Sequence, residues 1–218
     1  MKQSTGITVT LKAAVSVDGK IATGSGQSKW ITGDVARRKA HQLRQENDAI
    51  LVGINTVLTD DPELTVRGIE KGRSPVRIVL DSKARIPEQS RVFQNDGVPV
   101  IIITGNQAPS RSWPERGELK IIQAPEETPD ILWVLSELKN FGLKSLLVEG
   151  GSLIHASFLK SNCVDHLALF MAPKIIGGQD SLSWCGNINV ENVNDACQLD
   201  ISSITPLGED WFISASIK

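Results

Sequence analysis

Residues 145–159 read Ser-Leu-Leu-Val-Glu-Gly-Gly-Ser-Leu-Ile-His-Ala-Ser-Phe-Leu, and a strand, a turn and a helix follow one another within them. The apolar run 146–148 predicts a buried strand, which Glu149 ends with a charge. The diglycine 150–151 permits a tight turn and the close approach of a ligand to the backbone. A helix is expected next, with Ser152 as its N-cap and one apolar face made by Leu153, Ile154 and Phe158.

This turn points backbone N–H groups and the positive end of a helix dipole at the space beyond the strand. Both features favour a bound phosphate group. A diglycine between a strand and a helix is also an ordinary turn, so the stretch alone leaves two interpretations open.

Apolar runs of strand length recur on both sides of this stretch, with helical patterns between the earlier ones. We expect strands over 7–15, 48–52, 76–80, 98–103, 119–122 and 166–171, a helix capped by Asp34 that ends near residue 45, and a helix over 128–141 with Thr128 as its cap. Long polar loops are expected over 16–33 and 53–67. Two final strands, 199–204 and 211–217, flank Pro206-Leu207-Gly208, which is typical of a hairpin turn.

Alternation of strands and helices followed by a hairpin predicts an α/β fold. Its sheet should be mostly parallel, flanked by helices, with an antiparallel edge at the C-terminal end. Nothing in residues 1–218 is typical of a linker, so we expect a single domain.

Composition excludes several classes of partner. The net charge is −2, so no broad basic surface favours nucleic acid, and no apolar run reaches membrane-spanning length. The three cysteines, Cys163, Cys185 and Cys197, are widely spaced and form no C-x-x-C pair. They indicate neither a metal site nor a disulfide framework, but reduced thiols in a cytoplasmic protein.

Several catalytic motifs are missing. There is no Walker A loop, and the one G-x-G that could open a dinucleotide fingerprint, residues 24–26, has Lys29 where the third glycine belongs. The zinc-deaminase pair of motifs and the G-x-S-x-G elbow are also absent. What remains is a group of polar loops at strand ends, where open α/β sheets bind ligands. Two glycine-edged turns, at 150–151 and 177–178, and several arginines favour a ligand with more than one phosphate.

Five sections of the chain resemble, in order, the riboflavin-pathway pyrimidine reductases. They are residues 11–22, residues 26–32, parts of 49–67 (49–53, 56–57 and 60–67), residues 148–152 and residues 172–178. The similarity is to the reductase half of the bifunctional bacterial deaminase–reductase, and no deaminase domain is expected in this chain. The resemblance implies a dihydrofolate-reductase-like fold and a homodimer.

The same resemblance implies an NADPH-dependent oxidoreductase that converts the ribose of 5-amino-6-(5-phosphoribosylamino)uracil to a ribityl chain. One alternative is the same reduction before deamination, on the 2,5-diamino-6-ribosylamino-pyrimidinone 5′-phosphate. A second is a fold relative that reduces another substrate, such as a pterin. A third is a nucleotide-binding module without catalysis.

The resemblance also implies roles for individual residues. Lys12 and Glu149 are the expected proton-handling pair. Substrate-binding positions are Ser28, Arg44, Leu64, Arg67 and Glu149, with the two arginines on the 5′-phosphate. Cofactor-binding positions are Ala14, Trp30, Thr56, Asp60, Ser82, Gly151, Ser152, Leu153, Ile154, His155, Ala156 and Ser157. Charge alone adds Lys83 and Arg85 as ligands of an adenosine 2′-phosphate.

Each of these residues also has an ordinary interpretation. Lys12 could be a strand lysine whose head group reaches solvent. Glu149 could simply pair with a lysine at the strand end. Arg44 and Arg67 could be surface arginines, and Trp30 a core aromatic in an ordered loop.

Overall fold

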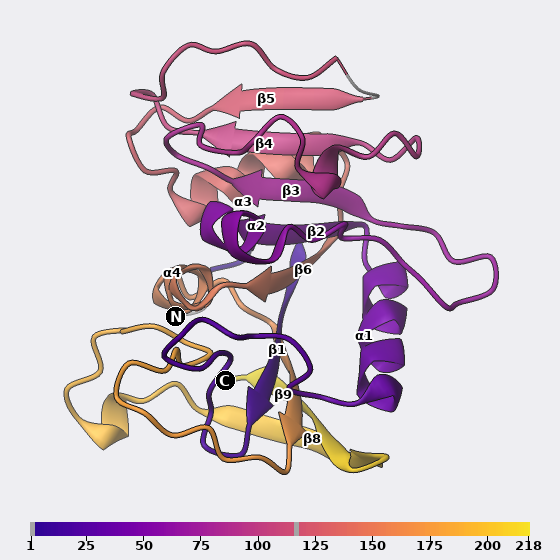
Figure 1. Ribbon diagram of the computed structural model, residues 1–218. Helices are drawn as coiled ribbons and strands as arrows, with labels where there is room; N and C mark the ends of the chain where they lie inside the picture. The colour runs from indigo at the N-terminus through magenta and orange to yellow at the C-terminus, as the bar shows by residue number, and fades with distance from the viewer. Residues whose placement is uncertain (1–2, 116–117) are drawn as a thin grey trace.

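The computed structural model describes residues 3–115 and 118–218, so residues 1, 2, 116 and 117 of the expected domain lie outside the described chain. Its strands form one sheet in the order β5-β4-β3-β2-β6-β1-β7-β9-β8 (Figure 1). The strands are β1 (Thr8–Ser16), β2 (Ala49–Gly53), β3 (Val76–Leu80), β4 (Val100–Thr104), β5 (Leu119–Gln123), β6 (Ser145–Gly150), β7 (His166–Ala172), β8 (Leu199–Leu207) and β9 (Asp210–Ile217). The helices are α1 (Asp34–Glu46), α2 (Ile54–Asp60), α3 (Ile131–Asn140) and α4 (Ser152–Lys160), with 3-10 turns η1 (Arg91–Phe93) and η2 (Val193–Asp195).

Parallel pairing joins every strand from β5 across to β7, and the pairing becomes antiparallel from β7 to β9 and from β9 to β8. β6 lies between β2 and β1, and both neighbours run parallel to it. β9 pairs antiparallel with β7, and β8 pairs antiparallel with β9 at the edge. The expected α/β fold, a mostly parallel sheet with an antiparallel C-terminal edge, is therefore confirmed.

Both faces of the sheet are covered, because successive side chains of a strand point to opposite sides. Ala49 and Leu51 of β2 join an apolar cluster that includes residues of α3 and α4. Ile50 and Val52 join a second cluster that includes residues of α2 and η1. Figure 1 shows α3 behind the sheet and α2 in front of it. Each buried aliphatic side chain of this kind contributes about 1.5–3 kcal/mol to stability.

Three helix starts differ from the expected ones. Gly33 is the N-cap of α1, and Asp34 is its first residue, where the carboxylate instead accepts from Arg37 one turn later. Asp130, not Thr128, caps α3, because its carboxylate accepts the backbone N–H of Trp133 at 3.0 Å. α4 likewise has Gly151 as its N-cap and Ser152 as its first residue. Leu153, expected on the apolar face of α4, is 65% exposed.

Two turn regions also differ. The expected loop over 53–67 contains the short helix α2, whose buried side chains are Ile54 and Val57. β8 continues through Pro206 and Leu207, so the hairpin turn is Gly208-Glu209. Gly208 has a φ of +69°, which the tight two-residue turn requires.

No helix in the described ranges is long and apolar enough to cross a membrane. The cysteines Cys163, Cys185 and Cys197 are free. The topology places the carboxyl ends of β1, β2 and β6 next to one another, with β6 inserted between the first two strands of the chain. This reversal of strand order is where open α/β sheets form their binding crevice.

Candidate functional site

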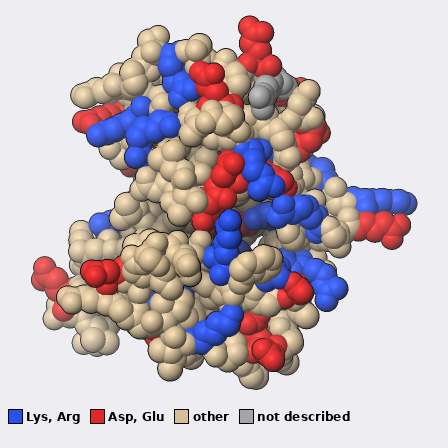
Figure 2. Space-filling model, viewed as in Figure 1, with Lys and Arg blue, Asp and Glu red and all other residues tan. Residues whose placement is uncertain are grey.

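A cavity of about 370 Å³ opens at the carboxyl ends of β1, β2 and β6. Figure 2 shows the molecule hollowed between the part that carries β2–β5 and the part that carries β7–β9, with basic and acidic side chains gathered there. Its lining includes Lys12, Ala14, Ser28, Trp30, Arg44, Thr56, Asp60, Leu64, Glu149, Gly151 and His155. The structure therefore brings together residues from five separate stretches of the sequence.

Glu149 owes its orientation to an irregularity in the sheet. On the β2 side, Leu51 pairs with Val148, whereas the next residue, Val52, pairs with Gly150. Glu149 is the extra residue between these two pairs, as in a β-bulge, a device that commonly re-aims a side chain beside an active site. Its carboxylate lines the cavity, although its neighbours Val148 and Gly150 are buried in the sheet.

The Glu149 carboxylate lies between two cations. Arg44 of α1 donates from Nε to Oε1 at 2.7 Å and from Nη2 to Oε2 at 2.8 Å, a two-pronged contact. Lys12 Nζ of β1 lies 3.7 Å from Oε2. The three side chains are 9%, 14% and 15% exposed for Glu149, Arg44 and Lys12, so solvent screens their interaction weakly.

This environment fixes the charge of Glu149. Burial opposes ionisation, but the positive charges of Arg44 and Lys12 and the hydrogen bonds from Arg44 outweigh it and lower the pKa of Glu149 to about 2. Glu149 is therefore an ionised carboxylate at neutral pH. It accepts hydrogen bonds and holds cations, but it carries no proton that it could donate.

Two other predicted positions bind each other across the cavity. Ser28 Oγ donates to Asp60 Oδ1 at 2.8 Å, which links the long loop over 16–33 to the end of α2. Trp30, two residues later, is 70% exposed, with a φ of +65°. Its ring lies against the guanidinium of Arg37, 4.3 Å from Arg37 Cζ to the ring centroid. Trp30 is thus a wall residue of the site and not a core aromatic.

The start of α4 reaches the cavity without a side-chain cap. Gly151 lines the cavity, and its backbone carbonyl accepts from the N–H groups of Ile154 and His155. No hydrogen bond among the described residues is donated by the N–H groups of Ser152 and Leu153. Thr56 Oγ1 lies beside this turn, 3.4 Å from where a Cβ at position 151 would stand. Such a helix start is suited to an anionic group.

His155 closes the inner side of the cavity. Its Nδ1 lies 2.8 Å from the Trp184 carbonyl oxygen, and its Nε2 lies 3.3 Å from the Val148 carbonyl oxygen. Burial lowers the pKa of His155 against the smaller opposing effect of these two carbonyls. His155 is therefore neutral at pH 7 and ties α4 to β6 and to the loop before Gly186.

Some predicted positions are not part of the cavity lining. Arg67 is bound to Glu63, with Nη1 2.5 Å from Oε2, and Ser82 lies after β3. The predicted positions outside the lining are Arg67, Ser82, Lys83, Arg85, Ser152, Leu153, Ile154, Ala156 and Ser157. Conversely, Lys29, Thr32 and Arg37 line the cavity and were not predicted as site residues. For Arg37, the available signal was its spacing from His41 and Arg44, which places the three basic residues on one face of α1.

Comparison with known proteins adds an independent observation. Residues 7–213 match the RibD C-terminal domain. The chain belongs to this family. The match covers every strand of the described sheet except the last residues of β9.

Individual relatives support the assignment. The chain is 38% identical over 212 residues to the 2,5-diamino-6-ribosylamino-4(3H)-pyrimidinone 5′-phosphate reductase of Methanothermobacter thermautotrophicus, covering 96% of this chain and 98% of that protein. It is also 38% identical to the riboflavin biosynthesis protein RibD of Bacillus amyloliquefaciens, covering 96% of this chain but 57% of RibD.

Solved structures agree in fold. The deaminase/reductase of Thermotoga maritima superposes with a TM-score of 0.82 at 30% identity, over 97% of this chain and 57% of that one. Dihydrofolate reductase from Enterococcus faecalis superposes with a TM-score of 0.57 at 12% identity, over 98% of each chain. The dihydrofolate-reductase-like fold is therefore confirmed.

Proposed function

We propose that this protein is the NADPH-dependent reductase that converts the ribose of 5-amino-6-(5-phosphoribosylamino)uracil to a ribityl chain in riboflavin biosynthesis. The observation that carries the proposal is the buried Lys12–Glu149–Arg44 group in a cavity beside the uncapped start of α4. Relatives that are named reductases of this pathway support it. The sheet, which takes strands from Thr8 to Ile217, supports a single reductase domain.

The α4 end of the cavity fits a nicotinamide dinucleotide. The free N–H groups of Ser152 and Leu153 would receive its pyrophosphate, and residues 154–157 continue the same helix. Ala14, Trp30, Thr56 and Asp60 would border the nicotinamide half. Ser82, with Lys83 and Arg85, would meet the adenosine end, where Arg85 already donates to Asn55 at 2.9 Å. When bound, NADPH supplies the hydride, and the protein supplies orientation and a proton.

Lys12 is the residue of this group that is suited to carry a proton. The ring-opened sugar is an imine at C1′, and its reduction needs one hydride at carbon and one proton at nitrogen. Because Glu149 is ionised, it holds no proton to give, but its Oε2 orients the Lys12 ammonium group 3.7 Å away. We therefore assign proton transfer to Lys12 and its orientation to Glu149.

The substrate phosphate belongs on the α1 side of the cavity. Arg44 uses its Nε and Nη2 for Glu149, and Nη1 donates to the Thr65 carbonyl at 2.8 Å. Arg67 follows two residues after Thr65, and its backbone N–H donates to His41 Nδ1 at 3.3 Å. Through these contacts Arg67 lies beside α1, the helix that carries Arg44. Binding of the 5′-phosphate by Arg67 would require its exposed side chain to leave Glu63.

A second candidate is the reduction of the diamino-pyrimidinone before deamination. It is favoured by the archaeal relative, which has that name and aligns with this chain over nearly its whole length. Comparing kcat/KM for the two phosphorylated substrates with NADPH tests both. We expect consumption of NADPH with a preference for the uracil. No consumption with either substrate would refute the reductase function.

We also propose that the protein acts as a homodimer in the cytoplasm. β8 pairs on one side only, and its side chains are exposed on both faces, including Ile201 (54%) and Ile204 (55%). Such an exposed apolar edge strand favours a covering partner, for which we propose a second copy of this chain. Free cysteines are typical of a reducing compartment.

A further inference from the structure

Residues 28–32 form one wall of the cavity, and we call this segment the arm. Each of its residues lines the cavity. Within residues 3–115 and 118–218, no backbone–backbone hydrogen bond joins the arm to another part of the chain. The position of this wall therefore depends on side chains that hold it from outside.

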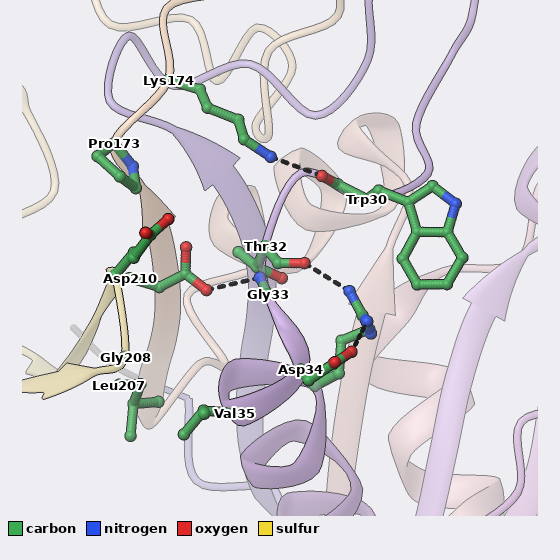
Figure 3. A pocket seen from close by; sticks show the side chains of 12 residues that line it. Trp30, Thr32, Gly33, Asp34, Val35, Pro173, Lys174, Leu207, Gly208 and Asp210 are labelled. Atoms are coloured by element: carbon green, nitrogen blue, oxygen red, sulfur yellow. Dashed lines mark hydrogen bonds and ion pairs between the residues drawn. The ribbon is translucent and has the colours of Figure 1, made fainter.

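Three successive carbonyl groups of the arm accept hydrogen bonds from cationic side chains. Lys174 Nζ donates to the carbonyls of Trp30 and Ile31, both at 2.7 Å. Arg37 Nη1 donates to the carbonyl of Thr32, also at 2.7 Å. Figure 3 shows Lys174 reaching the main chain at Trp30, while the indole of Trp30 points away from it.

The end of the arm is fixed by a carboxylate. The backbone N–H of Gly33 donates to Asp210 Oδ2 at 2.7 Å (Figure 3). Asp210 is the first residue of β9 and is only 4% exposed. It therefore connects the hairpin at the sheet edge to the point where the arm enters α1.

Lys174 and Asp210 stand behind the arm, outside the substrate cavity. Both line a second cavity of about 440 Å³, which the arm separates from the first one. Lys174 belongs to the 172–178 stretch, to which the proposed reaction gives no role. Trp30 has a φ of +65°, a conformation that costs energy for a residue with a side chain and persists only when its surroundings impose it. The two bonds from Lys174 to this residue and the next supply that restraint.

We infer that Lys174 and Asp210 are positioning residues, which hold the arm so that Ser28 and Trp30 face the substrate and cofactor. The expected change in KM rests on the proposed reductase function, whereas the expected loosening of the arm does not. A role in fold stability alone would lower the unfolding temperature without loosening the arm in the folded protein.

Limited proteolysis tests the structural consequence directly, because Lys29 is exposed within the arm and offers trypsin a cleavage site. Under native conditions, Lys174→Met should be cut after Lys29 about tenfold faster than the original protein. Lys174→Arg, which keeps a donor for both carbonyls, should be cut at the original rate. Lys120→Met removes the same charge from β5, where Lys120 lies over Phe141, and should also leave the rate unchanged.

Kinetics provide the second readout. Lys174→Met should raise the KM for the pyrimidine substrate about tenfold while kcat stays within about threefold, because the wall is displaced and Lys12 is not. Asp210→Ala, which removes the acceptor of the Gly33 N–H, should act in the same direction and replaces Lys174→Met if that variant does not fold. An unchanged cleavage rate after Lys29 in a folded variant, or equal acceleration in Lys120→Met, would overturn the inference. Absence of turnover in the original protein and in all variants would refute the reductase function. The cleavage rate after Lys29 would then still test whether Lys174 and Asp210 hold the arm.

Discussion

Glu149 keeps its negative charge in a place where burial alone would remove it. Two hydrogen bonds from Arg44 and the nearby Lys12 ammonium group stabilise the ionised form. Removing any one of the three side chains would therefore leave an uncompensated charge on the others. The sequence predicted Lys12, Arg44 and Glu149 as site residues only through resemblance. It did not predict that Arg44 binds Glu149, because residues 44 and 149 carry no local signal of their contact.

Replacing Glu149 by Gln tests this group. The change leaves Lys12 and Arg44 without a counter-charge, so the free energy of unfolding should fall by about 3 kcal/mol and turnover by about 100-fold, with the fold retained. Circular dichroism with urea unfolding, and NADPH oxidation, measure the two effects. Glu46→Gln makes the same chemical change at the exposed end of α1 and should alter neither. Full activity in Glu149→Gln would remove Glu149 from the mechanism.

Acid should weaken the fold through the same residue. The pKa of Glu149 is lowered from 4.5 to about 2 in the folded protein. Its stabilising contribution is therefore fully present above about pH 4.5 and is lost as the pH falls through 2, with a total of about 3 kcal/mol. Urea unfolding between pH 6 and pH 2.5 should show a steeper loss for the original protein than for Glu149→Gln. Equal slopes would contradict the assigned charge state.

The helices and strands differ in how well they could be predicted from the sequence. The strands were predictable to within a few residues, because short continuous apolar runs such as 146–148 and 100–103 have the length and the flanking turn residues of buried strands. α2 was missed because its seven residues make only about two turns, too few for a helical period to stand out. The N-caps of α1 and α4 lie one residue before the expected ones, since Gly33 and Gly151 cap without any side-chain signal, and the cap of α3 lies two residues later than expected.

The exposed edge strand β8 leads to a prediction about the oligomeric state. If a second copy covers its apolar side chains, Ile204→Glu should place a charge in that interface and yield a monomer. Sedimentation velocity at micromolar concentration measures the change. Leu58→Glu introduces the same charge at another exposed apolar residue, on α2, and should leave the dimer intact. A monomeric original protein, or a dimeric Ile204→Glu variant, would refute this interface.

At the scale of the whole molecule, the site exists because the sheet brings distant segments to one edge. β6 enters between β2 and β1, so Glu149 meets Lys12 of β1 and faces Arg44 of α1. Sequence pattern predicted loops at strand ends but not which loops would converge, since convergence depends on strand order. The arm and its support from Lys174 and Asp210 were likewise invisible, because both partners lie more than half the chain away from residue 30.

The central claim is that this cavity transfers a hydride to C1′ of a phosphorylated ribosylamino-pyrimidine. The most direct test incubates the protein with NADPH deuterated at C4, in each stereoisomer, and the phosphoribosylamino-uracil, and then locates deuterium in the product by mass spectrometry and NMR. We expect a ribityl product with one deuterium at C1′ from one of the two stereoisomers. Unchanged ribosyl substrate, or a reduced product with deuterium from neither isomer, would contradict it.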